Sequence, residues 1–460
     1  MSFLNIITYF SLIIITKQKD SLYKIPLDIV SQNYIPMIPI YIKEYPSISK
    51  LLSLDINLVE SWIFNYNLDD NDDNRRNVIT KRGFYFISGK KNKETIYLNS
   101  EIKIADFNYM EVNQINDGIY NSGSLSMNKI LDSNNIISYF TFDDSNQIKY
   151  DKYFGFCLDL TNLKQNKPLL YIGNLKELNN DISKLTRFPI YAGDSEKDKE
   201  KMKSIWAIKL KGLFIGNVTK NINMDNGNNE VNHIDKTKNK GLIIDEPATI
   251  DTIFNYIYIT KEAMLFLIAN YFNDKREICE REGVQDEDTY EIKYKCLKNK
   301  KKKLNNINLI LENNITIELT NEDLLNCAIN KNMGSKISDD KDTCEFIIRY
   351  HNNIEHYSIG LPILRKFKTY FLYNDNSILF ENKNAFSLNY LNEAQFSNIS
   401  RQNKKTLGQT IKELFNTTLC ITFIFVLLVG GFYLYDKYYD NNGYGEGAEK
   451  IININKYTNL

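Results

Sequence analysis

Histidine is scarce in this chain. Its 460 residues include only three, His233, His351 and His356. The last two lie five residues apart with no cysteine near them, which is poor spacing for metal ligands. We therefore expect no metal site.

Net charge and phosphate-binding loops are missing as well. The formal net charge is zero, so there is no electrostatic reason to expect nucleic acid as a partner. The sequence has no G-x-G-x-x-G or Walker-type loop. GYGEG at Gly443–Gly447 lies in a polar tail, without the preceding strand and following helix that such a loop needs. We expect no cofactor.

Long helical periods are also rare. Most of residues 34–390 reads as short apolar strands separated by turn residues. Examples are Ile38–Ile42, Phe84–Ile87, Ile136–Phe142, Ile205–Leu210, Ile307–Leu311 and Glu345–Arg349. The clearest helical stretch is Thr260–Phe272, which opens with a threonine and has an acid close behind it. The pattern predicts a large, all-β protein.

The two ends of the chain carry apolar runs. Phe3–Thr16 has the length of a secretory signal peptide, which we place at residues 1–16; the alternative is a buried N-terminal strand. Leu419–Tyr435 is uncharged and almost wholly apolar, which favours a transmembrane helix over residues 418–435; the alternative is a buried core helix. A juxtamembrane stalk would then occupy 391–417 and a cytoplasmic tail 436–460.

The orientation of such a span follows from the signal peptide. Lysines and arginines before the span would by themselves keep the large domain in the cytosol. A working signal peptide overrides that bias, so we expect an exported ectodomain in the secretory pathway or at the cell surface. Consensus glycosylation sites at Asn217, Asn314 and Asn398 fit export.

Four of the six cysteines cluster in one region: Cys279, Cys296, Cys327 and Cys344. An even number in an exported protein favours two disulfides. The alternative is a set of buried free thiols in a cytosolic protein. The residues alone leave the pairing open.

Two apolar strands each run into an acid. SLDINLVESW places Asp55 after Leu51, Leu52 and Leu54, and GLIIDEPAT places Asp245 after three apolar residues. Each acid alone is more often a turn residue at the end of a strand. Two carboxyl groups brought close together cannot both ionise, and such a pair can activate a water and protonate a leaving group. The two strands therefore predict a paired-acid site.

Several further motifs, in order along residues 34–385, resemble those of the pepsin-like aspartic proteases. Trp62 follows Asp55 at the family's spacing of seven residues, and Tyr120-Asn-Ser-Gly-Ser124 resembles the family's flap, Tyr-Gly-Thr-Gly-Ser. Tyr153–Leu160 is similar to its Gly-Ile-Leu-Gly-Leu turn. In the second half, the similar segments are Trp206–Leu210, Ile243–Asp245, Ile307–Asp323 and Tyr357–Phe371.

The resemblance implies a bilobal fold with β lobes at 30–165 and 166–390 and a peptide or protein bound in the cleft between them. It implies Asp55 and Asp245 as catalytic residues, one from each lobe. Tyr120, Ser122, Gly123 and Trp62 would form the flap and contact substrate. It also implies a disulfide between Cys296 and Cys344, where the family carries one.

The departures from the family fall next to the acids. Asp-Thr-Gly-Ser becomes Asp55-Ile-Asn-Leu58, and the second motif becomes Asp245-Glu-Pro-Ala248. The family's threonine hydroxyls hold the two loops together, and proline has no N–H and a fixed φ. Two hypotheses follow. The chain is a membrane-anchored aspartic endopeptidase, or it is a non-catalytic relative that binds a peptide or protein partner.

Overall fold

The computed structural model of the chain describes residues 22–29, 35–46, 48–64, 78–82, 85–115, 122–140, 151–161, 168–216, 240–282, 291–327, 343–354, 356–381, 388–390 and 430. The chain divides into two compact units, Met1–Phe396 and Ser397–Leu460. The expected signal peptide, stalk and tail lie outside the described residues, as does the expected membrane span apart from Gly430. Within the part that is described, no helix is long and apolar enough to cross a membrane.

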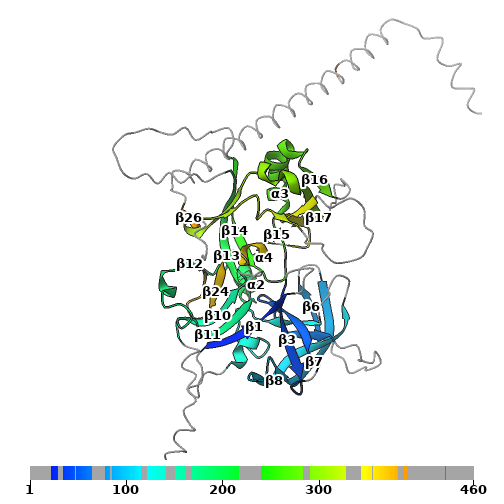
Figure 1. The fold of residues 1–460 in the computed structure, drawn as a ribbon, viewed down its shortest axis with the longest axis vertical. Coiled ribbons are helices and arrows are strands. Elements are labelled where there is room, and N and C mark those ends of the chain that lie inside the picture. Colours follow the sequence, from blue (N-terminus) through cyan, green and yellow to red (C-terminus); the bar gives the residue numbers. More distant parts are fainter. Residues whose placement is uncertain are drawn as a thin grey trace, which may run out of the picture. The chain divides into compact units, whose positions relative to one another are not determined.

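The first sheet has eight strands in the order β2-β3-β4-β9-β5-β8-β7-β6. Figure 1 shows β3, β6, β7 and β8 grouped in one part of the first unit. The bounds are β2 Asp28–Ile29, β3 Pro36–Ile42, β4 Lys50–Asp55, β5 Trp62–Phe64, β6 Val78–Arg82, β7 Tyr85–Tyr97, β8 Lys103–Ile115 and β9 Gly123–Ser126.

The second sheet has twelve strands. Eleven follow the order β20-β21-β17-β22-β15-β23-β14-β13-β18-β19-β26, and β16 pairs with β17. The bounds are β13 Ala207–Ile215, β14 Lys240–Ile250, β15 Ile257–Tyr258, β16 Cys279–Glu282, β17 Glu291–Leu297, β18 Ile307–Leu311, β19 Ile315–Leu319, β20 Leu325–Asn326, β21 Thr343–Phe346, β22 Ile348–His351, β23 Tyr357–Ile359 and β26 Leu388–Tyr390.

A third sheet of six strands, in the order β1-β11-β10-β24-β25-β12, draws on both halves of the chain. Its strands are β1 Leu22–Pro26, β10 Phe154–Asp159, β11 Leu169–Asn174, β12 Thr186–Pro189, β24 Lys368–Leu372 and β25 Ser377–Glu381. The expected lobe boundary at 165/166 falls between β10 and β11, which pair antiparallel. This sheet therefore belongs to both expected lobes rather than to one of them.

The two large sheets share a local topology. β4 pairs parallel with β9, β9 pairs antiparallel with β5, and β5 pairs parallel with β8. In the second sheet, β14, β23, β15 and β22 repeat these three relationships in the same order. The chain thus builds one strand arrangement twice, and the ends of β4 and β14 occupy equivalent places in it.

Helices are short among the described residues, as the sequence predicts. The longer ones are α2 Glu196–Met202 and α3 Lys261–Leu267, and α3 continues as the π-helix η4 Ile268–Phe272. The Thr260 hydroxyl caps α3 by accepting a hydrogen bond from the Ala263 N–H, so the expected helix at 260–272 is confirmed. The remaining helices are α4 Leu361–Leu364 and the 3₁₀ turns η1 Ile136–Tyr139, η3 Ile182–Lys184, η5 Asn273–Lys275, η6 Lys298–Lys303 and η7 Glu312–Asn314.

The strand predicted at Ile136–Phe142 is wrong. Ile136–Tyr139 forms η1, because the Asn135 side chain accepts a hydrogen bond from the Ile137 N–H and starts a helical turn. Ile136 and Ile137 are nevertheless buried, so the apolar run contributes to the core without forming a strand. An apolar run of this length does not by itself distinguish a strand from a buried turn of helix.

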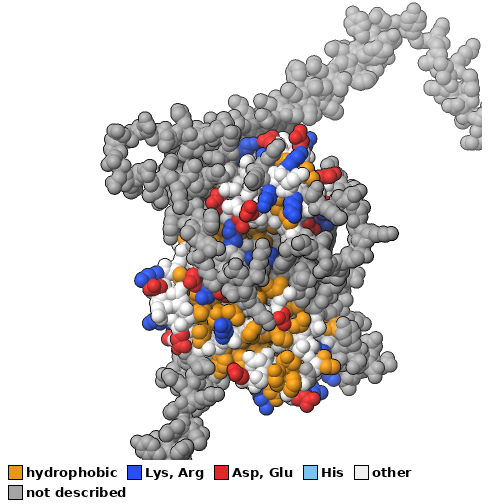
Figure 2. Space-filling model, viewed as in Figure 1, with side chains coloured by type: hydrophobic (Ala, Val, Ile, Leu, Met, Phe, Trp, Pro, Cys, Tyr) orange, Lys and Arg blue, Asp and Glu red, His pale blue; other side chains and the backbone are white. Residues whose placement is uncertain are grey.

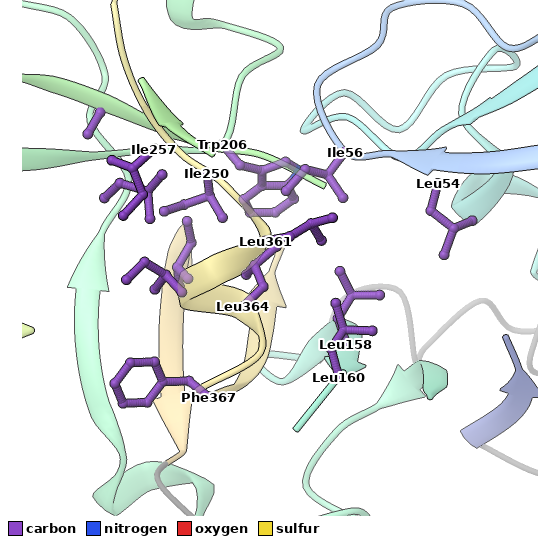
Figure 3. Close-up of a cluster of buried hydrophobic side chains, with 14 of the residues drawn as sticks. Leu54, Ile56, Leu158, Leu160, Trp206, Ile250, Ile257, Leu361, Leu364 and Phe367 are labelled. Atoms are coloured by element: carbon purple, nitrogen blue, oxygen red, sulfur yellow. The ribbon is translucent and has the colours of Figure 1, made fainter. Parts of the chain in front are cut away.

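The main core is continuous across the elements that flank the ends of β4 and β14. Leu54, Ile56, Trp206 and Ile250 belong to one buried cluster, and each of these side chains is fully buried. Figure 3 shows Ile56 extending toward the indole ring of Trp206. Burying apolar surface is the main favourable contribution to folding, so this cluster fixes the positions of the two strand ends.

The surface is mixed in charge. On the face shown in Figure 2, positive and negative side chains of the described residues are interspersed, and apolar side chains gather in the lower half of the view. This distribution accords with the zero formal charge of the sequence.

Candidate functional site

The first acid lies where the sequence predicts it. β4 buries Leu52 and Leu54 completely and ends at Asp55, which is also fully buried. The Asn57 N–H donates a hydrogen bond to Asp55 Oδ1 over 3.0 Å. The chain thus turns back on itself after the acid, and this bond fixes one carboxyl oxygen of Asp55.

Asp245 does not join Asp55. It lies within β14 with φ at +59°, and its side chain is 52% exposed. Its carboxylate accepts a hydrogen bond from Lys211 Nζ at 2.6 Å and lies 3.4 Å from Lys209 Nζ. The Lys211 hydrogen bond, aided by the charges of both lysines, lowers the pKa of Asp245 despite its partial burial. Asp245 is a surface ion-pair partner in this structure.

The acid at the end of β14 is Asp251, six residues further on. An extended chain rises about 3.3 Å per residue, so Asp251 lies roughly 20 Å along the strand from Asp245. Asp251 is fully buried, and its Oδ1 accepts a hydrogen bond from the Ile253 N–H at 3.1 Å. This bond repeats the bond from Asn57 to Asp55, with the donor again two residues after the acid.

Strand register establishes the equivalence of Asp55 and Asp251. Two residues before Asp55, Ser53 pairs with Ser124, and two residues before Asp251, Thr249 pairs with Ser358. Seven residues after each acid the same serines pair again, with Trp62 in the first sheet and with Tyr258 in the second. That spacing of seven was visible in the sequence and could have identified Asp251.

Hydrogen bonds join the two loops that carry these acids, which we call the first acid loop (Leu54–Leu58) and the second acid loop (Ile250–Phe254). Thr252 is fully buried, and its hydroxyl donates to the carbonyl oxygen of Leu54 at 2.5 Å. The hydroxyl oxygen of Thr252 also accepts a hydrogen bond from the Ile56 N–H at 3.3 Å. The two buried acids are therefore held on loops that are fastened to each other.

The expected departures at the second acid do not apply to Asp251. Glu246, Pro247 and Ala248 lie within β14, where Pro247 pairs with Lys209 in the strand register. The residue after Asp251 is Thr252, so the loop carries the hydroxyl that the Asp245 assignment lacked. Apolar side chains do follow both motifs: Leu58 packs with Trp62, Met110 and Val112, and half-buried Ile253 packs against this group.

Two of the residues expected to form the flap, Ser122 and Gly123, lie beside or in a buried strand. Tyr120 lies outside the described residues. Ser122 accepts a hydrogen bond through its carbonyl oxygen from the Phe64 N–H at 2.8 Å, and Gly123 opens β9, which inserts between β4 and β5. Gly123 has φ of +154°, and a Cβ there would meet the Trp62 carbonyl oxygen at 2.3 Å. Gly123 and Ser124 thus lie in a strand that pairs with β4, which ends at Asp55, and with β5.

Trp62 is buried beside that strand and is 1% exposed. Its indole Nε1 is buried, and within the described part of the chain it has no hydrogen-bond partner. The Trp62 carbonyl oxygen lies against Gly123, and the expected contact of Trp62 with substrate stays a prediction.

The four clustered cysteines form two disulfides, Cys279–Cys296 and Cys327–Cys344. The expected Cys296–Cys344 bond is wrong. On β17, Cys296 lies opposite Cys279 on β16 and opposite Cys344 on β21, so it has a cross-strand cysteine neighbour on both sides. The bond forms on the β16 side, and Cys344 pairs with Cys327, which follows β20.

Two of the expected glycosylation sites, Asn217 and Asn398, lie outside the described residues. The third, Asn314, ends the 3₁₀ turn η7 between β18 and β19. Within the described residues, no cluster of three or more histidine, cysteine or acidic side chains could hold a metal ion.

Comparison with known proteins supports the fold. No family model matches the sequence, and no curated protein matches it. Among solved structures, the chain is similar to the crystal structure of the aspartic proteinase from Irpex lacteus, with a TM-score of 0.52 and 13% sequence identity. The match covers 78% of this chain and 97% of that chain. At this identity the similarity shows a pepsin-like fold.

Proposed function

We propose that the chain is an aspartic endopeptidase whose two acids are Asp55 and Asp251. The observation that carries the proposal is the equivalence of these residues: each is buried, ends the same strand of a repeated arrangement, and accepts an N–H bond from two residues further on. Paired-carboxyl hydrolysis requires two acids close enough to share one proton, and the hydrogen bonds between the two acid loops support such an arrangement.

In the proposed reaction, the two carboxyl groups hold one proton between them. The ionised carboxylate accepts a proton from a water molecule, whose oxygen then attacks the peptide carbonyl carbon. The protonated carboxyl group donates its proton to the carbonyl oxygen, which gives a tetrahedral diol. The amide nitrogen then takes the proton that the first carboxyl group received from water, and the C–N bond breaks. One hydroxyl of the diol gives its proton to the second carboxylate as the new carboxylic acid forms, so the pair is left with one proton again.

A second candidate function is peptide binding without hydrolysis. Leu58 and Ile253 favour it. Leu58 stands where the pepsin-like proteases have a hydroxyl, and Ile253 stands where they have a glycine. Such a protein would hold an extended peptide or protein partner against the two acid loops. The two candidates differ in one measurable property, cleavage that depends on both acids.

The proposed setting is the secretory pathway or the cell surface, with the chain anchored by one C-terminal helix. The two disulfides support export, since such bonds persist in oxidising compartments. The test is expression of the full chain with a C-terminal epitope, followed by protease treatment of intact cells. Loss of the large domain with protection of the epitope supports this orientation at the cell surface. If both are protected, the treatment is repeated after permeabilisation of the plasma membrane alone: loss of the epitope with protection of the large domain supports a secretory organelle, and loss of both would contradict export.

The test of the proposed function compares four full-length proteins: the parent, Asp55→Asn, Asp251→Asn and Asp245→Asn. Each is incubated with an unfolded protein between about pH 3 and 6, where a carboxyl pair holds a single proton. We expect the first two substitutions to reduce cleavage on the order of 10,000-fold, by analogy with the loss of a catalytic group in other proteases. Asp245→Asn is the matched control and should cleave like the parent.

Three outcomes decide between the candidates. Cleavage that requires Asp55 and Asp251 but not Asp245 supports the endopeptidase. A folded parent that binds peptide and does not cleave it supports the non-catalytic alternative. Cleavage that requires Asp245 would overturn the assignment of Asp251 as the second acid.

A further inference from the structure

The first acid loop has no hydroxyl at the position that corresponds to Thr252. Thr252 follows Asp251 directly, and the residue that follows Asp55 is Ile56, whose side chain is apolar and fully buried. Thr252 donates a hydrogen bond to the Leu54 carbonyl and accepts one from the Ile56 N–H, so both bonds join a side chain of the second acid loop to the backbone of the first. By itself, this arrangement provides no side-chain hydrogen bond from the first acid loop to the backbone of the second.

Asn57 makes the return bond. Its side-chain Nδ2 donates to the carbonyl oxygen of Ile250 at 2.6 Å. Ile250 immediately precedes Asp251, as Leu54 immediately precedes Asp55. Each loop thus donates one side-chain hydrogen bond to the carbonyl that precedes the other loop's acid, from Thr252 in one direction and from Asn57 in the other.

Two further polar groups of Asn57 are also hydrogen-bonded. Its side-chain Oδ1 accepts from the Trp206 N–H at 2.8 Å, and its own N–H donates to Asp55 Oδ1. Trp206 is joined in turn to the second acid loop, because its carbonyl oxygen accepts from the Ile250 N–H at 2.8 Å. Asn57 is 4% exposed, so these bonds are shielded from water and are correspondingly strong.

We propose that Asn57 is a positioning residue that replaces the missing hydroxyl at residue 56 and holds the two acid loops in register through Ile250. An amide is suited to this place because it offers a donor and an acceptor together. The donor reaches Ile250 and the acceptor reaches Trp206, so a single side chain fixes the first acid loop to the end of β14 and to the residue that precedes β13.

A hydroxyl at residue 56 and the amide of Asn57 are then alternatives for one function, which a double-substitution cycle can test in the full chain. The variants are Asn57→Gly, Ile56→Thr and the pair Ile56→Thr/Asn57→Gly. In the parent, Ile56→Thr removes buried apolar surface while Ile250 is already bonded, so it should lower the urea midpoint. In the Asn57→Gly background, the new hydroxyl can take over the vacant bond to Ile250, so the same change should raise the midpoint.

A second variant separates hydrogen bonding from space filling. Asn57→Leu has nearly the same shape as asparagine and no polar atoms. If Asn57 only fills space, Asn57→Leu has the same urea midpoint as the parent, and Ile56→Thr lowers the midpoint in every background. That result would overturn the proposal. If the donor matters, Asn57→Leu resembles Asn57→Gly, and Ile56→Thr reverses its sign.

The catalytic consequence rests on the proposed function and has its own readout. Displacement of an acid by about 1 Å costs on the order of 100-fold, so Asn57→Gly should lower kcat by about that factor with little change in KM, and Ile56→Thr should restore much of it. If the parent does not cleave at all, the proposed function fails, while the urea cycle still decides the role of Asn57. A cleaving parent whose kcat is unaffected by Asn57→Gly would contradict the positioning role.

Discussion

The hydroxyl of Thr252 donates a hydrogen bond to the carbonyl oxygen of Leu54 over 2.5 Å, although 198 residues separate the two positions in sequence. Both residues are fully buried. Leu54 precedes Asp55 and Thr252 follows Asp251, so the bond joins the two acid loops directly beside their acids. The two equivalent sheets thus meet through a buried polar contact.

Substitution Thr252→Val should destabilise the protein because it keeps the shape of the side chain and removes its hydroxyl. The Leu54 carbonyl and the Ile56 N–H would then be buried without this partner. Each unsatisfied group costs about 1–3 kcal/mol. We expect the free energy of unfolding in urea to fall by a total in or above that range, and cleavage to fall with it. Thr252→Ser, which retains the hydroxyl, should stay within about 1 kcal/mol of the parent; equal losses in the two variants would contradict this reading.

The general fold could be predicted because its signals are local or repeat at fixed spacing. The apolar run into Asp55 and the tryptophan seven residues later both survive in the structure as β4 and β5. The segment Tyr357–Phe371, which resembles a segment of the family, forms a strand, a short helix and a strand. Such patterns can be recognised in one stretch of sequence, because a short apolar run bounded by turn residues is typical of a strand buried on both faces.

The second acid could not be chosen from its approach alone. Asp245 and Asp251 both follow isoleucines of the same strand, so an apolar run into an acid describes each of them. What distinguishes them is the pairing of Thr249 and Tyr258 with Ser358, a contact made about 100 residues further along the chain. Strand register depends on tertiary pairing. In the sequence, its one trace is the shared spacing of seven residues from Asp55 to Trp62 and from Asp251 to Tyr258.

Other misreadings have the same origin. Tyr153–Leu160 resembles a turn motif, but Phe154–Asp159 forms β10 in the six-stranded sheet. There it pairs with β24, Lys368–Leu372, which is distant in the sequence. Gly123 resembles a flap glycine and lies instead in a buried strand. In both cases a short glycine-containing pattern fits more than one backbone setting, and long-range strand pairing selects between them.

Asp245 should be dispensable for folding and cleavage alike. The hydrogen bond from Lys211 chiefly lowers the pKa of Asp245 in the folded state. Its ionised form therefore stabilises the fold at pH values above the pKa of the unfolded state, and this stabilisation is lost as the pH falls through the folded-state pKa. The side chain is about half exposed, and exposed ion pairs contribute only about 0–1 kcal/mol. Asp245→Asn should therefore change the free energy of unfolding by no more than that, since asparagine also tolerates positive φ.

The pKa of Asp245 gives an independent check. Substitution Lys211→Met removes the hydrogen bond that chiefly lowers the pKa of Asp245, so carboxyl NMR titration should show this pKa rising toward its ordinary value of 3.8. Lys209→Met serves as the matched comparison and should have a smaller effect, because Lys209 lies further from the carboxylate. A larger rise with Lys209→Met would contradict the geometry.

The disulfide pairing can be verified by peptide mapping under non-reducing conditions. We expect linked peptides that contain Cys279 with Cys296 and Cys327 with Cys344. Each bond closes a loop with a sequence separation of 17 residues, for which the chain-entropy model gives about 3 kcal/mol of stabilisation. The double substitutions Cys279→Ala/Cys296→Ala and Cys327→Ala/Cys344→Ala should each lower stability by about this amount. A linked Cys296–Cys344 peptide would show that the structure has the wrong partner.

His351 should make the protein less stable as the solution becomes mildly acidic. Burial lowers its pKa below the ordinary 6.5, and the nearby charge of Glu291 only partly opposes this. The folded state therefore binds fewer protons than the unfolded state between the folded pKa and 6.5, so stability rises with pH across that window and falls as the pH drops through it.

Substitution His351→Gln tests this pH dependence, because glutamine keeps a polar side chain that does not titrate. The decrease in the free energy of unfolding between about pH 7 and pH 5 should be smaller in His351→Gln than in the parent. Carboxyl groups that do not interact with His351 contribute equally to both proteins and cancel in the comparison. A decrease that is larger in the variant would mean that the charge of Glu291 outweighs burial and raises the pKa. His351 lies on β22, which pairs with β15 at Tyr258. In that case, protonation of His351 at mildly acidic pH would make the second sheet more stable, not less.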